Sequence, residues 1–250
     1  MRFLDVLEPV ILIALPVFMV VCAWFRLPNA VVLTTAAAII TLVPFFARFE
    51  LSHLRARDLM PIVVMSALAV AGRMILAPIP AIKPVMAIVV LTGLAFGKQS
   101  GFITGALTIL VSNIFFGQGP WTPWQMYSCG LAGYIAGSVS GFSVFRKPPA
   151  VAALGFCLVF LYGGILDTWT LIGFVDPLTT ESAIATYTVG LAYNTAHAIG
   201  TAAFLLIFTN VWFQISGRIK VKYGVGLQDG MCLSSSGAAA PATSGEVPHG

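Results

Sequence analysis

Long apolar segments, separated by short polar connections, run through most of this chain. A helix that crosses the hydrocarbon core of a membrane needs about 20 predominantly apolar residues. Eight segments approach or exceed this length, and they lie at 9–25, 29–47, 59–77, 82–96, 100–116, 126–145, 151–173 and 183–213. Charged residues make up only 9% of the chain, whereas soluble domains carry about 25%. The sequence therefore predicts an all-α integral membrane protein with eight transmembrane helices.

The distribution of basic residues gives this topology an orientation. If the N-terminus lies inside and the helices alternate, the outer segments contain only Arg26 and Lys83, and Arg73 lies within a predicted helix. The other ten Lys and Arg residues fall on the inner side: Arg2, Arg48, Arg55, Arg57, Lys98, Arg146, Lys147, Arg218, Lys220 and Lys222. Because cytoplasmic loops are enriched in Lys and Arg, we expect both termini to be cytoplasmic.

Three regions differ in composition. Residues 1–58 combine a transmembrane hairpin with a charged connector, and residues 59–216 form a six-helix core. Residues 217–250 begin with a basic stretch and continue as a Ser/Gly/Ala/Pro-rich tail, which we expect to be disordered because it has too little apolar surface to bury. Asp5 and Glu8 argue against a cleaved signal peptide, so we interpret the first apolar segment as a retained helix.

The sequence contains no pattern that indicates catalysis. It has no Walker A motif, no HExxH and no CxxC, and its acidic residues are too scattered to hold the metal ions of a lipid transferase. No basic face carries aromatic platforms for nucleic acid. Cys22, Cys129 and Cys157 lie in apolar segments and are interpreted as packing residues. We therefore predict no catalytic residue, no metal ligand, no cofactor, no nucleic-acid partner and no enzymatic activity.

Small residues recur at intervals of four in the sixth apolar segment, at Cys129, Gly133, Gly137 and Gly141. Such stripes allow helix backbones to approach closely within membranes. We expect this one to serve packing inside the helix bundle.

The third outer loop, residues 115–126, reads FFGQGPWTPWQM. Trp121 and Trp124 could stack on a planar ligand, and Gln118 and Gln125 could hydrogen-bond to it. Alternatively, the tryptophans belong to the aromatic belt that membrane proteins place at the interface with water.

Three charged residues lie near the outer side. Arg73 lies about a turn below the outer end of the third segment, and Asp167 lies towards the outer end of the seventh. A charge there is costly unless it is paired or faces water, so the two residues either pair structurally or line a polar cavity. Lys83, in the second outer loop, either extends towards lipid headgroups or meets an anionic or carbonyl group of a substrate.

Tyr193, Asn194 and His197 have helical spacings that place them on neighbouring parts of one surface of the eighth segment. They either make interhelical hydrogen bonds or form the wall of a binding site. In the second interpretation, Asn113, near the outer end of the fifth segment, joins them.

Residues 56–137 resemble the S components of energy-coupling factor (ECF) transporters. The resemblance rests on ALAVAGR, on IKPVMAIVVLTG, on the loop SNIFFGQGPWTPWQM and on the Gly-rich helix that follows it. It extends over about 55–215 and is weaker after about 150.

This resemblance implies a substrate-binding subunit of a vitamin or micronutrient importer in a bacterial plasma membrane, in contact with membrane lipid. S components have six helices and bind their substrate from outside, in a pocket formed by outer loops and helix ends. They then dock on a coupling transmembrane subunit driven by two ATPase subunits, and transport is thought to involve toppling in the membrane. Ala67 and Ala71 match the Ala-x-x-x-Ala pattern of the docking surface. The two additional N-terminal helices depart from the six-helix plan.

The resemblance slightly favours cobalamin or a queuosine-type precursor as substrate. Two other functions remain open at this point. A membrane enzyme of lipid or isoprenoid metabolism would need paired acidic motifs, for which the inner connector offers only Glu50 and Asp58. A non-transporting assembly protein would use its small-residue stripes for protein contacts alone.

Overall fold

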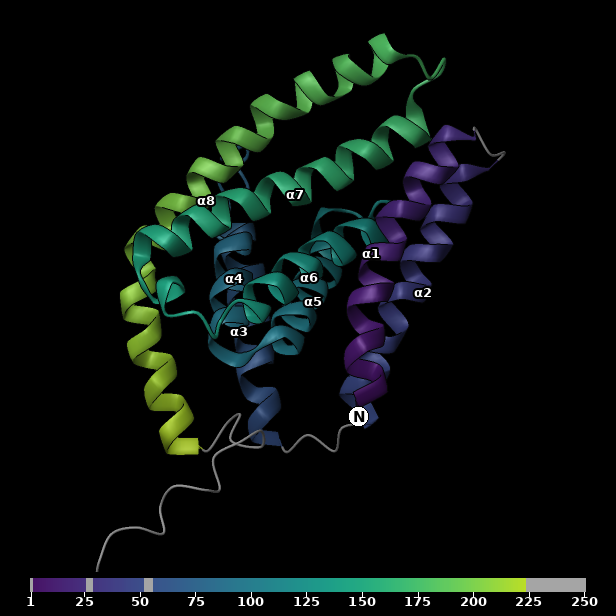
Figure 1. Ribbon diagram of the computed structural model, residues 1–250. Helices are drawn as coiled ribbons and strands as arrows, with labels where there is room; N and C mark the ends of the chain where they lie inside the picture. Colours follow the sequence, from purple (N-terminus) through teal and green to yellow (C-terminus); the bar gives the residue numbers. More distant parts are fainter. Residues whose placement is uncertain (1, 26–28, 52–55, 224–250) are drawn as a thin grey trace, which may run out of the picture.

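The computed structural model describes residues 2–25, 29–51 and 56–223, and within these ranges the chain is helical with no strand (Figure 1). The tail expected to be disordered lies, from residue 224, outside the described residues. The α-helices are α1 (Arg2–Trp24), α2 (Ala30–Leu51), α3 (Ala56–Ile75), α4 (Val85–Phe96), α5 (Lys98–Phe116), α6 (Thr122–Ser138), α7 (Pro148–Phe174) and α8 (Thr180–Tyr223), with a short 3-10 helix η1 (Ser143–Arg146) before α7.

Several of these helices have the length and apolarity of membrane spans. Within the described residues, four stretches qualify fully: Ala30–Ala47, Lys98–Phe116, Pro148–Phe174 and Thr180–Lys222. Shorter apolar helical stretches lie at Glu8–Cys22, Leu59–Ile75 and Val85–Phe96. The fold is therefore that of an all-α, multi-pass membrane protein. With 44 residues, α8 is about 66 Å long and exceeds the thickness of a bilayer's hydrocarbon core.

Helices α5 and α6 form the centre of the bundle. They pack on each other, α4 contacts both, and α7 pairs with α8. In Figure 1 the α1–α2 pair flanks the central helices on one side, and α3 and α4 lie on the other. Helices α2, α3, α4 and α7 each pack against α5 or α6, and α1 reaches both through side-chain contacts, so the geometry of this central pair sets the positions of its neighbours.

Glycines bring α5 and α6 into backbone contact. A Cβ atom on Gly133 would overlap the carbonyl group of Gly101, and one on Gly105 would lie 2.6 Å from the carbonyl oxygen of Cys129. This confirms the predicted packing role of the α6 stripe at Cys129 and Gly133. Gly141 does not share it, because α6 ends at Ser138 and a Cβ on Gly141 would meet open space.

The bounds of helices α6 and α8 differ from the sequence prediction. Helix α6 begins at Thr122 rather than 126 and ends at Ser138 rather than 145. Pro123 occupies its first turn, where a missing N–H costs nothing and the fixed φ favours a helix. Helix α8 continues to Tyr223, so the basic residues expected to start a separate region at 217 extend the helix instead. Cations in a last helical turn interact favourably with the helix dipole.

We expect Gly133→Ala to destabilise the protein by about 2 kcal/mol or more, because the new methyl group forces two helix backbones apart. The measurement is the thermal unfolding midpoint of the purified protein in detergent. Gly164→Ala is the matched control, since a Cβ at Gly164 has no neighbour within 4 Å. Equal midpoints for the two variants would contradict the close α5–α6 contact.

Candidate functional site

A cavity of about 210 Å³ lies among the helices at one end of the bundle. Helices α3 to α8 all contribute to its wall, and α1 and α2 do not. Residues predicted as a binding set from the sequence converge on it: Arg73, Lys83, Gln125, Asp167, Tyr193, Asn194 and His197. The remaining wall is mainly apolar, from Ala81, Val85, Met86, Ile109, Cys129, Tyr162, Gly163 and Leu166.

Arg73 enters the cavity from the last turn of α3. Its guanidinium donates hydrogen bonds to the Ser112 hydroxyl and to Asn113 Oδ1, the latter at 2.9 Å. It also lies 4.8 Å from the centre of the Phe116 ring, a favourable distance for a cation–π contact. Helix α5 thus holds the cation in place through neutral groups, which leaves its positive charge available to a ligand.

Asn113 lies behind the cavity wall and is almost completely buried. Besides accepting from Arg73, its amide nitrogen donates to Gln125 Oε1 at 2.8 Å and to Thr122 Oγ1 at 3.1 Å. One side chain therefore fixes both Arg73 and the pocket residue Gln125. Asn113 acts as a positioning residue and does not line the cavity.

Asp167 of α7 and Asn194 of α8 form a second polar group in the wall. Asn194 Nδ2 donates to Asp167 Oδ2 at 2.8 Å. Gly163 and Gly190 make room for this pair, because a Cβ at either position would overlap the Asn194 amide or the Asp167 carboxyl. In the described structure Arg73 and Asp167 form no ion pair with each other, so the direct pairing considered above is not realised.

His197 lies between two aromatic rings, with ring centres 6.1 Å from Tyr162 and 6.4 Å from Tyr193. Both ring nitrogens are buried, and neither has a hydrogen-bond partner within the described part of the chain. An unpaired polar atom away from water is costly. His197 belongs to the cavity wall, although its two nitrogens are themselves screened from the cavity.

Lys83 belongs to the connection between α3 and α4. Burial lowers the pKa of its amine, and the nearby positive charge of Arg73 lowers the pKa further. Two cations and one carboxylate thus line a small cavity, an arrangement that favours hydrogen-bond acceptors on the ligand near Arg73 and Lys83.

The tryptophan-containing segment does not contribute its rings to this cavity. Trp124 is fully buried and meets the Tyr127 ring edge-on at 6.3 Å. Trp121 is partly exposed and covers Gly119, and Gln118 donates to the Leu110 carbonyl at 2.9 Å. Because α6 begins at Thr122, Trp124 lies on a helix within the bundle rather than in an outer loop. Of this segment only Gln125 reaches the wall.

Sequence reasoning missed Tyr162 and the contribution of Cys129 to the wall. A signal for Tyr162 was present, since Tyr162, Gly163, Leu166 and Asp167 repeat with the period of one helix face. Ala67 and Ala71, predicted for docking, are exposed on α3 beside Val63, Val64 and Leu68.

Comparison with known families identifies the fold that carries this cavity. The model of the family described as "ECF-type riboflavin transporter, S component" matches residues 53–212, which is more than half of the chain. The chain belongs to this family. No curated protein and no solved structure matched it.

The match fits the geometry of the site. All residues of the cavity wall of this S component fall within 53–212, whereas α1 and α2 precede the matched region. The family comprises transporter components rather than enzymes. A transport-related, substrate-binding role follows from family membership.

We expect Asn113→Ala to lower stability by about 2 kcal/mol, because it leaves buried partners without hydrogen bonds. It should also weaken ligand binding, because Arg73 and Gln125 both lose their support. Thermal unfolding and equilibrium binding check the two effects. Asn210→Ala is the control, since Asn210 is exposed on α8; a loss of similar size in that variant would contradict the positioning role.

Proposed function

We propose that this S component captures a small planar vitamin of the riboflavin class on the extracellular side of a bacterial plasma membrane. It then delivers the vitamin in concert with a coupling transmembrane subunit and two ATPase subunits, and Ala67 and Ala71 lie in the contact with the coupling subunit. Its six-helix core is α3–α8, preceded by the additional α1–α2 hairpin, with both termini cytoplasmic.

The chemistry of the cavity wall is the observation that carries this proposal. Riboflavin has a planar ring system with carbonyl acceptors and a ring N–H donor. Arg73 and Lys83 supply donors for the carbonyl oxygens, and Asp167 supplies an acceptor for the N–H. Tyr162 and His197 contribute aromatic rings to the wall. The name of the matched family supports the same vitamin.

The position of the cavity supports capture from outside. Its wall includes the last turn of α3 and the first turns of α4 and α6. Lys98 at the start of α5, Arg146 and Lys147 before α7, and Lys222 at the end of α8 belong to the other ends of the helices. Since basic ends face the cytoplasm, the cavity faces the medium.

The size of the cavity favours a small ligand over cobalamin, one of the two substrates suggested by the sequence. Pockets for drug-sized ligands enclose about 300–1,000 Å³, and this one encloses about 210 Å³. A cavity of this volume suits a planar vitamin ring whose tail is directed outward, whereas a corrinoid would lie mostly outside the wall. A queuosine-type precursor shares the planar ring and is the second ligand to be tested.

The direct test is equilibrium binding to the purified chain in detergent, followed by quenching of riboflavin fluorescence. Arg73→Gln and Asp167→Asn should each raise the Kd about 10- to 100-fold, the effect of losing a hydrogen bond to a charged group. Glu181→Gln, an exposed carboxylate of α8, is the matched control. Binding of cobalamin or of the queuosine precursor in the absence of riboflavin binding would overturn the assignment.

Binding should also depend on pH through Lys83. The charged amine is the donor, and burial together with Arg73 lowers its pKa below the ordinary value of 10.5. Affinity should therefore fall as the pH rises from neutral towards 10.5, as the amine loses its proton. Lys83→Met should bind more weakly at neutral pH and lose this dependence. An unchanged pH profile in Lys83→Met would show that Lys83 does not meet the ligand.

A further inference from the structure

Helices α1 and α2 lie outside the family match and outside the cavity wall, yet they pack directly on the centre of the bundle. The Phe45 ring of α2 stacks on Phe102 of α5, with ring centres 3.9 Å apart, and meets Tyr134 of α6 edge-on at 5.9 Å. One apolar cluster contains residues of this hairpin together with residues of α5 and α6: Leu12, Leu15, Met19, Leu42 and Phe45 with Phe102, Ile109, Tyr127 and Tyr134.

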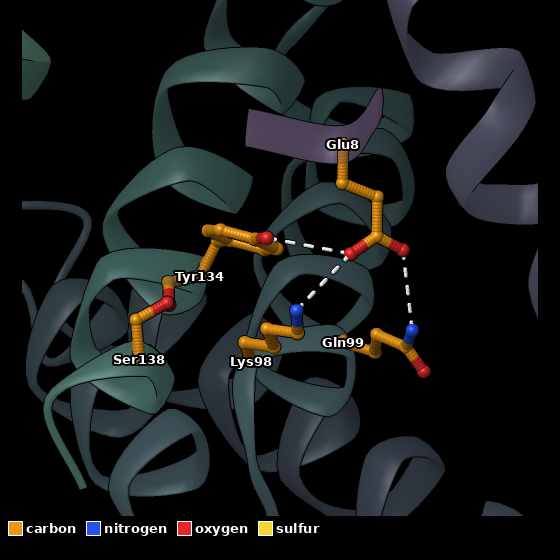
Figure 2. A network of polar contacts seen from close by, with 5 residues as sticks. All are labelled: Glu8, Lys98, Gln99, Tyr134 and Ser138. Carbon is orange, nitrogen blue, oxygen red and sulfur yellow. Dashed lines mark hydrogen bonds and ion pairs between the residues drawn. The ribbon is translucent and has the colours of Figure 1, made fainter. Parts of the chain in front are cut away.

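A buried carboxylate fastens α1 to both central helices (Figure 2). Glu8 is only 4% exposed. Its Oε2 lies 3.5 Å from Lys98 Nζ and accepts a hydrogen bond from the Tyr134 hydroxyl at 3.3 Å, and its Oε1 accepts from Gln99 Nε2 at 3.2 Å. A carboxylate is tolerated away from water only when it is paired and hydrogen-bonded. Separation of α1 from α5 and α6 would break all these contacts.

A second polar contact lies one helical turn further along α1. Pro16 has no N–H, so the carbonyl of Leu12, four residues earlier, lacks its usual helical donor. The buried Tyr127 hydroxyl of α6 donates to this carbonyl. Glu8 and Leu12 thus meet Tyr134 and Tyr127 in reversed order, as two antiparallel helices require. Within the membrane no water is available to donate to the Leu12 carbonyl. This carbonyl therefore has the Tyr127 donor only while α1 packs against α6.

We infer that α1 and α2 are a permanent layer of the membrane body that carries the pocket, attached by the Glu8 carboxylate and the Tyr127 and Tyr134 hydroxyls. The hairpin closes the α5–α6 face to other proteins, so a partner subunit must approach this body from another side. Any movement of the core in the membrane includes the hairpin. This inference concerns a region that the family match does not cover and does not depend on the identity of the vitamin.

Thiol linking tests the placement. In the full chain with Cys22, Cys129, Cys157 and Cys232 replaced by Ala, the pair Phe45→Cys and Phe102→Cys should be joined efficiently by a short bifunctional thiol reagent in native membranes. The pair Ile40→Cys and Phe102→Cys is the matched control, because Ile40 is 68% exposed on α2 and faces away from the bundle. Mass spectrometry of linked peptides gives the yield. Equal yields for the two pairs would overturn the inference.

Single-atom variants test the attachment itself. Glu8→Gln and Tyr127→Phe should each lower the thermal unfolding midpoint by about 5 °C or more and reduce the yield of the 45–102 link several-fold. Glu181→Gln and Tyr187→Phe are the controls, since both side chains are exposed on α8. Tyr187→Phe also removes an interhelical hydrogen bond, to Thr168, but at an exposed site. Target variants that match these controls in both readouts would contradict the anchoring role.

Whether the hairpin stays attached while the protein binds its ligand is tested by comparing the linked protein with the unlinked protein of the same cysteine background. The linked chain should bind riboflavin with an unchanged Kd, because the pocket does not require the hairpin to leave. A Kd that rises about tenfold on linking and recovers when a cleavable reagent is cut would show that the hairpin must move. If neither form binds riboflavin and the wild-type chain also fails to bind it, the proposed ligand is refuted, while the linking yields still decide where the hairpin lies.

Discussion

The backbone contact between α5 and α6 is the constraint on which the rest of this bundle depends. Gly101, Gly105 and Gly133 let the two helices approach until no side chain fits between them. One end of this pair presents Ser112 and Asn113 to Arg73, and Asn113 also holds Gln125. One side of the same pair packs against α1 and α2. The pocket and the additional hairpin are therefore both built on the same two helices.

Inside a membrane every polar group must find a partner within the protein, and this requirement explains most of the polar residues in the helices. Asn113 connects Arg73 to Gln125, Asn194 donates to Asp167, and Tyr127 replaces the donor that Pro16 lacks. Among the described residues, buried polar atoms of Thr35, Thr104, Trp124, Trp169, His197 and Thr201 lack a partner. Of these six residues, His197 is the one that belongs to the cavity wall.

The sequence predicted best those features that have long sequence patterns, namely the apolar helices and the family resemblance. Hydropathy predicted helices that the structure contains, and the resemblance to S components was confirmed by the family match. Residues at the cavity were predictable because charged and polar side chains are rare in apolar segments and expensive there. Arg73, Asp167 and His197 were identified by this argument and converge in space.

Other features could not be predicted, for physical reasons. Trp124 was predicted in the outer loop 115–126, whereas Pro123 lies in the first turn of α6 and Trp124 is buried in the bundle. Glu8 was used only as evidence against a signal peptide, since its partners Lys98, Gln99 and Tyr134 are far away in sequence. Tyr162 was missed because its one signal was its position on the same helix face as Asp167, and a tyrosine in an apolar helix is not costly in itself.

Native mass spectrometry of the gently purified protein can name the ligand, since a tightly bound vitamin survives purification and is identified by its mass. We expect the wild-type chain to carry riboflavin or a close relative and the Arg73→Gln, Asp167→Asn double variant, folded to the same extent, to carry none. A corrinoid on the wild-type chain, or equal retention by the double variant, would contradict a riboflavin-class ligand in this cavity.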